Sequence, residues 1–183
     1  MKEADTSRRS FITWLWRVPV LAVVLGGIYG LYEAYRIQFG KRRPSSEPSF
    51  IKGERLELAP LATFNKPWVS QTFSYEDVPA IAIRLPEATA GALSYDGHHI
   101  AAFSRVCTHQ SCIVNLNDNP EALAVAYNYR SDEPALACRC HFSVFLPGQG
   151  GRAVSGPAIE PLPRLELELL EDTVYVTGIE EKT

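Results

Sequence analysis

The stretch ALACRCHFSVF, residues 135–145, places two cysteines one residue apart and a histidine directly after the second. The whole chain of 183 residues has four cysteines and four histidines. A second short stretch, CTHQSC at residues 107–112, holds the other two cysteines and one more histidine. Thiolate and imidazole groups are metal ligands, so their concentration in two short boxes indicates a metal centre or a disulfide framework.

Three interpretations of these two boxes compete. A structural zinc site is closed by four ligands, so it leaves two of the six cysteine and histidine side chains unused. Two disulfides account for the cysteines of an exported protein, but they leave the histidines without a role. In the third interpretation two cysteines hold one iron, two histidines hold a second iron, and the remaining cysteines tie the two loops together.

The third pattern resembles the Rieske iron-sulfur family, whose boxes read C-x-H-x-G-C and C-x-C-H-x-S. The resemblance implies one [2Fe-2S] cluster, with ligands from Cys107, His109, Cys138 and His141. It also implies a disulfide between Cys112 and Cys140. Two imidazoles in place of two thiolates raise the reduction potential of such a cluster. We expect the two histidines to be the catalytic residues, since an imidazole can take a proton while the cluster takes an electron.

Residues around the expected cluster carry over from the family in part. Ser143 matches a serine whose hydroxyl donates to a bridging sulfide, and Gly156 and Pro157 match the proline-containing loop that covers the cluster. Phe145 stands where high-potential members have a tyrosine that bonds a ligand sulfur. Hydrogen bonds to cluster sulfurs help to set the potential, so we expect a lowered midpoint, which suits menaquinol better than ubiquinol.

Four positions near the ligands depart from the family. Gln110 stands where quinol-oxidising members usually have leucine, Ser111 and Phe142 replace glycines, and Arg139 replaces a proline. We expect the cluster to tolerate all four changes and the docking surface to be unusual.

The N-terminal segment predicts export and anchoring. SRRSFIT, residues 7–13, resembles a twin-arginine export signal, an address read by a receptor for folded cargo. The alternative is that Arg8 and Arg9 form only the positive flank of a Sec signal or anchor. The run from Phe11 to Tyr32 has one charge, at Arg17, and is long enough to span a bilayer. No A-x-A-like cleavage site follows it, so we expect an uncleaved anchor.

The expected domain order is a cytoplasmic twin-arginine segment, a transmembrane anchor, a linker or hinge and a Rieske domain, at residues 1–10, 11–38, 39–49 and 50–183. The cluster-binding part is expected at about 105–160. This order predicts a single-pass protein of the bacterial cytoplasmic membrane, with a cytoplasmic N-terminus and a periplasmic Rieske domain. Basic residues just past the span oppose this orientation under the positive-inside rule. The export signal takes precedence, because a dedicated receptor moves the folded domain.

The exported part is expected to be all-β, an antiparallel sandwich or barrel with an inserted cluster-binding subdomain. AIAIRL at 80–85 alternates like a strand, and Asp96-Gly97 suits the turn of a hairpin. The run 165–179 predicts a second hairpin that turns at Glu171-Asp172. ALAVAYNY at 122–129 predicts an added strand between the boxes. His98 and His99 flank the first turn and are expected to be solvated loop residues outside the site.

Two functions fit these expectations. The first is the Rieske subunit of a cytochrome bc-type quinol oxidoreductase, which takes an electron from quinol and passes it to a cytochrome c-type haem. Its expected partners are a cytochrome b-type subunit, a cytochrome c-type haem protein, quinol and the lipid bilayer, with no nucleic acid. The alternative is the Rieske small subunit of a periplasmic molybdenum enzyme resembling arsenite oxidase. The membrane anchor and the proline-containing linker favour the first.

Overall fold

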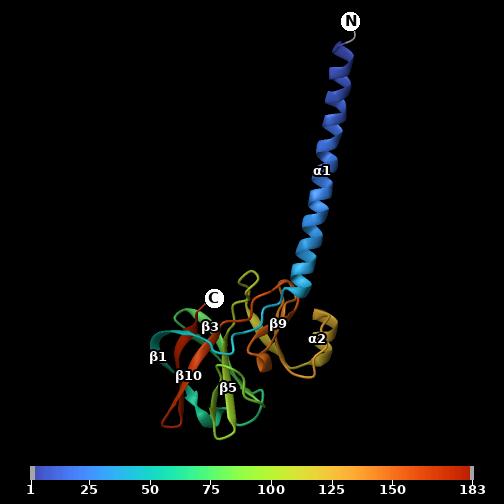
Figure 1. Cartoon of the computed structure of the whole chain (residues 1–183). Helices are drawn as coiled ribbons and strands as arrows, with labels where there is room; N and C mark the ends of the chain where they lie inside the picture. Colours follow the sequence, from blue (N-terminus) through green and yellow to red (C-terminus); the bar gives the residue numbers. More distant parts are fainter. Residues whose placement is uncertain (1–2, 182–183) are drawn as a thin grey trace. The chain divides into compact units, whose positions relative to one another are not determined.

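The computed structural model describes residues 3–181, and for residues 3–9 it describes the backbone alone. A long helix, α1 (Glu3–Phe39), comes first and contains the apolar span Ser10–Phe39 (Figure 1). Within the described residues this is one helix long and apolar enough to cross a membrane. It supports a single-pass anchor where the apolar run predicts one. The side chains of the twin-arginine pair lie outside the described residues.

The second unit, residues 40–181 of the described chain, is built on a curled antiparallel sheet of seven strands in the order β1-β11-β10-β5-β3-β2, with β4 paired to β5. Its strands are β1 (Phe50–Pro60), β2 (Ser70–Tyr75), β3 (Val78–Leu85), β4 (Leu93–Tyr95), β5 (His98–Ser104), β10 (Arg164–Leu170) and β11 (Thr173–Glu180). A short 3-10 helix, η1 (Leu61–Thr63), follows β1. The expected all-β fold is confirmed.

Both predicted hairpins are present. Asp96 and Gly97 join β4 to β5 with φ angles of 45° and 72°. Glu171 and Asp172 join β10 to β11 with φ angles of 48° and 64°. Two consecutive residues with positive φ make the type I′ turn that fits the twist of paired strands. His98 and His99 are the first residues of β5, so the expectation that they are loop residues is wrong, and both are half-buried.

A smaller sheet is inserted between β5 and β10 of the large sheet. Its strands are β6 (Val114–Asn117), β7 (Ala135–Cys138), β8 (Val144–Leu146) and β9 (Arg152–Ser155), in sequence order and all antiparallel. A 3-10 helix, η2 (Pro147–Gln149), links the last two strands. Both cysteine boxes adjoin these strands, so the small sheet lies where the sequence predicts the inserted subdomain.

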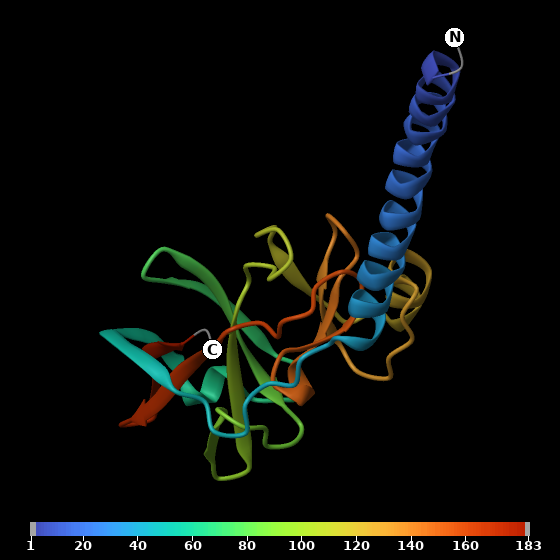
Figure 2. The same ribbon diagram turned by 45° about the horizontal axis from the view of Figure 1, so that its top comes forward.

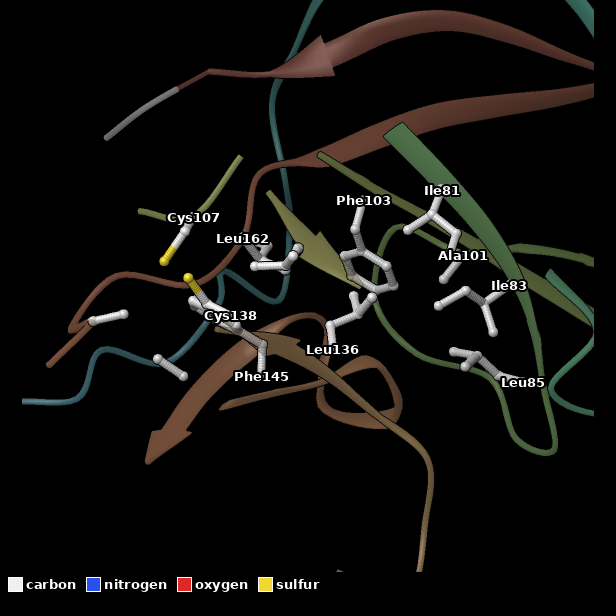
Figure 3. Packing of buried hydrophobic residues seen from close by; sticks show 13 residues of the cluster. Ile81, Ile83, Leu85, Ala101, Phe103, Cys107, Leu136, Cys138, Phe145 and Leu162 are labelled. Carbon is white, nitrogen blue, oxygen red and sulfur yellow. The ribbon is translucent and has the colours of Figure 1, made fainter. Parts of the chain in front are cut away.

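The core lies between the two sheets. Alternate residues of β3 point to opposite faces of the large sheet. Ile81 and Ile83 therefore join the core shared with Leu136 and Phe145 of the small sheet, as Figure 3 shows for this cluster. Ala80 and Ala82 face a second core, which consists mainly of residues from the strands of the large sheet itself. The first core ends at Cys107 and Cys138, so apolar packing fixes the backbone from which the site is built.

The segment between β6 and β7 is a helix, α2 (Pro120–Tyr127), so the strand predicted at 122–129 is wrong. The Asn119 side chain accepts hydrogen bonds from the amides of Glu121 and Ala122, at 3.0 and 3.1 Å. Pro120 occupies the first helical position, where its missing N–H costs nothing. Leu123 and Tyr127 are one helical turn apart and buried, and they join a third apolar cluster with the small sheet.

The segment 40–49, the expected linker, makes specific contacts with the rest of this unit. The Arg42 amide donates to the carbonyl of Ile159 (3.0 Å). The buried Arg164 guanidinium donates to the Ser45 carbonyl (2.9 Å) and makes a two-point ion pair with Glu180. Figures 1 and 2 show this light-blue segment beside the orange chain that leads to β10. The domain boundaries and the hinge role stay predictions.

Candidate metal centre

The first box, residues 107–112, is a tight loop after β5. The amide of Cys107 donates to the carbonyl of Cys112 (2.8 Å), and the amide of Ser111 donates back to Cys107 (2.9 Å). A bridge between Val106 and Ile113 closes the base of the loop. Ser111 has a φ of 57°, in the left-handed region that favours glycine. This conformation explains why the family has glycine at the position.

The second box is the loop of the β7–β8 hairpin. The amide of Cys138 donates to the carbonyl of Ser143 (2.9 Å), which closes the loop. Phe142 has a φ of 59°, so it too adopts a glycine-like conformation where the family has glycine. Its ring is half exposed and makes an edge contact with Tyr127 of α2, with centroids 5.9 Å apart. The added helix thus supports the residue that departs from the family.

The four cysteines divide into a bonded pair and a free pair. Cys112 and Cys140 form the expected disulfide, with their Cα atoms 6.5 Å apart, and join the two loops. Cys107 and Cys138 are free and buried, and Figure 3 shows their sulfur atoms pointing toward each other. Burial raises the pKa of the Cys107 thiol, and backbone N–H groups of His109 and Gln110 act against that rise. Two facing sulfurs suit a bound metal ion, and the amide donors favour the thiolate form of Cys107 that would bind it.

The two histidines lie beside each other on the two loops. The rings of His109 and His141 have centroids 4.8 Å apart and meet at 88°. Nδ1 of His109 is buried and has no hydrogen-bond partner. A buried polar atom without a partner is costly, so this nitrogen fits a metal ligand. Burial, then the neighbouring His141 and Lys41, lower the pKa of His109, which favours the neutral ring that binds metals.

A simple cluster of three sulfurs is also present but does not describe the site. The sulfur atoms of Cys112, Cys138 and Cys140 lie within 4.8 Å of one another. Cys112 and Cys140 are bonded to each other, so neither sulfur is a thiolate ligand. The donors that remain are two thiols and two imidazoles. A framework of two disulfides would leave no free thiols, so it does not describe the site.

The third loop, residues 155–163, lies against both boxes. Gly156 has a φ of 74°, and a Cβ there would lie 2.6 Å from the carbonyl oxygen of Phe142. The buried Ser143 hydroxyl accepts a hydrogen bond from the Ala158 amide (3.1 Å), and its own hydrogen is not used in that bond. Thr108 of the first box donates to the Glu160 carbonyl (2.8 Å). Pro157 follows Gly156 in the half-buried part of this loop.

Two further predicted residues occupy different environments. Phe145 is fully buried in the core that includes Cys107 and Cys138. Gln110 is exposed next to His109. Thr108 and Lys41 were not predicted as part of the site. The Lys41 ammonium group donates to two carbonyl groups of the third loop. Their partners are backbone atoms distant in the chain, and no residue pattern marks such contacts.

Comparisons with known proteins agree with this geometry. Residues 76–166 match the family model of the Rieske [2Fe-2S] domain. The chain is 27% identical to the iodate reductase subunit IdrB of Pseudomonas sp. (strain SCT) over 181 residues, which is 97% of this chain and 81% of that protein. It is 31% identical to the cytochrome bc1 complex Rieske iron-sulfur subunit of Streptomyces lividans over 75 residues, 41% of this chain and 37% of that protein.

Among solved structures, the soluble domain of the Rieske protein II from Sulfolobus acidocaldarius superposes with a TM-score of 0.52 at 21% identity. The match covers 69% of this chain and 78% of that one, and it shows the same fold. The relatives with known roles are subunits of oxidoreductases, which supports electron transfer as the role of this chain. The chain therefore belongs to the Rieske iron-sulfur family, and its domain is of the kind that binds a [2Fe-2S] cluster.

Proposed function

We propose that this protein is the membrane-anchored Rieske subunit of a multi-subunit respiratory oxidoreductase related to iodate reductase. The observation that carries the proposal is the extent of the match. Similarity to the iodate reductase subunit runs through 97% of this chain, whereas similarity to the bc1 subunit of Streptomyces lividans is confined to 41% of it. The longer match takes in the anchor as well as the cluster-binding part, so it is the better guide to the kind of complex.

In this role Cys107 and Cys138 bind one iron through sulfur, and His109 and His141 bind the other through nitrogen. The orphaned Nδ1 of His109 and the two facing, buried sulfurs support this ligand set. A bound [2Fe-2S] cluster accepts and releases one electron at a time. The protein contributes two buried sulfurs on one side of the site and the exposed ring of His141 on the other.

The partner in this proposal is a larger catalytic subunit that acts on a small oxyanion, as the name of the iodate reductase relative suggests. A molybdenum centre in that subunit fits the resemblance to arsenite oxidase. With a cluster held by these four residues, the protein would pass electrons between the catalytic subunit and a c-type haem or another membrane carrier. The direction of electron flow follows from the potentials of the two partners.

The second candidate is the bc-type subunit that takes an electron from quinol, with menaquinol as the favoured donor. The exposed His141 ring and the bc1 relative support it, because a surface imidazole can accept a hydrogen bond from a quinol. In either role we propose that α1 anchors the protein in the cytoplasmic membrane, with the N-terminus inside and the Rieske domain on the periplasmic face.

Purification of the tagged full chain from its own membranes in mild detergent separates the two candidates. The proposal predicts that a large subunit containing molybdenum copurifies in a fixed ratio and that quinol-site inhibitors leave the cluster EPR spectrum unchanged. Copurification of b-type haem and a spectrum that shifts with inhibitor would replace the proposal with the bc-type role. The variant Cys107→Ser, which lacks an expected iron ligand, controls for binding that does not depend on the cluster.

A further inference from the structure

Lys41 links the start of the expected linker to the loop that covers the candidate metal centre. It lies two residues beyond the end of α1. Its side-chain ammonium group donates to the carbonyl oxygen of Ala158 (2.6 Å) and to the carbonyl oxygen of Gly156. The side chain is partly buried. Lysine is seldom buried without partners, so two carbonyl acceptors explain how this one is tolerated.

The next residue of the linker reinforces the same attachment. The Arg42 amide donates to the Ile159 carbonyl (3.0 Å), and its guanidinium lies 3.1 Å from Glu160. The Arg42 and Glu160 side chains are both largely exposed, so their ion pair adds little free energy. The partly buried contact of Lys41 is therefore the specific one.

Lys41 acts on the metal centre by two routes. The first is mechanical, because its acceptors flank Pro157 in a loop that touches the second box. Gly156 lies against the backbone of Phe142 and Ser143, and the Ala158 amide donates to the Ser143 hydroxyl. The second is electrostatic, since Ala158, which accepts from the Lys41 ammonium group, also donates to Ser143 of the second box and so brings the positive charge close to the site.

We propose that Lys41 is a positioning residue that fixes the covering loop and supplies a positive charge that favours the reduced state of the cluster. The added electron makes the site one unit more negative, so a nearby fixed cation stabilises the reduced state more than the oxidised state. At an effective dielectric constant of about 20, two unit charges about 10 Å apart interact strongly enough to change an equilibrium roughly tenfold. This inference rests on the proposed ligand set and not on the identity of the partner.

The test compares the midpoint potentials of four full-length proteins by EPR-monitored redox titration. They are the natural chain, Lys41→Met, Lys41→Arg and the control Lys52→Met. Lys52 is exposed on β1 and pairs with Glu166, so its replacement makes the same change in net charge away from the covering loop. We expect Lys41→Met to lower the electron affinity of the cluster about tenfold, equal to about 59 mV for a one-electron couple. Lys41→Arg keeps the charge and should recover most of that loss.

A midpoint in Lys41→Met that equals the midpoint in Lys52→Met overturns the inference. If the natural chain shows no Rieske-type signal at all, the proposed function fails instead, so the two failures are distinct. If the Lys41→Met protein does not hold its cluster, a second measurement still tests the inference. In cluster-free protein with the disulfide intact, hydrogen exchange of segment 156–160 should be faster in Lys41→Met than in Lys52→Met, and equal exchange overturns the inference.

Discussion

Gly156 is the position where the fit between the covering loop and the second box can be tested most sharply. It has a φ of 74°, and a Cβ would lie 2.6 Å from the Phe142 carbonyl oxygen and 2.6 Å from the Ser143 Cα. Both are backbone atoms, so no side chain can rotate away to make room. Gly156→Ala must therefore move the loop, the second box or both.

Gly97→Ala is a matched control for this change. Gly97 has nearly the same φ, 72°, but a Cβ there has no heavy atom within 4 Å. A left-handed conformation costs an L-residue about 1–2 kcal/mol, and both variants carry that cost. Overpacking typically adds about 1–3 kcal/mol, and only Gly156→Ala should show this addition. We expect the free energy of unfolding to fall by about 2–5 kcal/mol in Gly156→Ala and by about 1–2 kcal/mol in Gly97→Ala.

This difference can be measured by guanidinium unfolding followed by near-UV circular dichroism. The sample is the cluster-free full chain in detergent, with the disulfide intact. Iron-loaded protein gives a second readout, the rate at which the visible absorbance of the cluster is lost. We expect faster loss in Gly156→Ala and a rate close to that of the natural chain in Gly97→Ala. Equal effects of the two substitutions on both readouts would refute the close approach of the loop to the second box.

Four further predictions follow from single contacts. Arg164→Leu leaves the carboxylate of Glu180 without its partner in a largely buried site, so chemical unfolding should show a loss of about 3–5 kcal/mol; a loss under about 1 kcal/mol would contradict the buried ion pair. Phe145→Tyr should raise the cluster midpoint by about 60 mV if the new hydroxyl donates to a ligand sulfur with about 1.4 kcal/mol, and an unchanged midpoint in a redox titration would remove the reason for expecting a low potential. Asn119→Ala removes the cap of α2 and should cost about 1 kcal/mol in the same unfolding assay, while no change would mean that the cap is unimportant. The pKa of His109 is lowered in the folded chain, so as pH falls below about 6.5 the unfolded chain binds a proton at this residue before the folded chain does. Cluster-free protein should therefore lose stability as pH falls through about 6.5. His109→Asn should reduce that loss, and an unchanged pH profile in the variant would contradict the prediction.

The features that the sequence predicted correctly are those whose signals are local. Each cysteine box spans a few residues, and each predicted hairpin turn is a dipeptide able to adopt positive φ. The apolar run that becomes α1 is continuous in the sequence. Short-range chemistry of this kind can be identified without knowing the fold.

The strand predicted at 122–129 failed because two kinds of evidence conflicted there. Small residues alternate with larger apolar ones there, which favoured a strand, but Asn119 and Pro120 form the start of a helix. The buried pair Leu123 and Tyr127, four residues apart, also has the spacing of a helix face. The helix-start residues therefore outweigh the alternation in this segment.

Contacts between distant segments could not be predicted from the sequence. Lys41 meets the Gly156 carbonyl across 115 positions, and Thr108 meets the Glu160 carbonyl across 52. The acceptors are backbone oxygens, which every residue has, so the residue types carry no signal of the pairing. Only the folded chain brings these donors to the third loop.

EPR of the purified, reduced full chain can show whether two cysteines and two histidines hold one iron-sulfur cluster. The expected result is a signal whose average g value lies below that of the free electron, with iron and acid-labile sulfide present in equal amounts. The signal should disappear in Cys107→Ser and Cys138→Ser and persist in Gly97→Ala. An iron-replete preparation with no such signal, or a signal unaffected by loss of both cysteines, would contradict the proposed site.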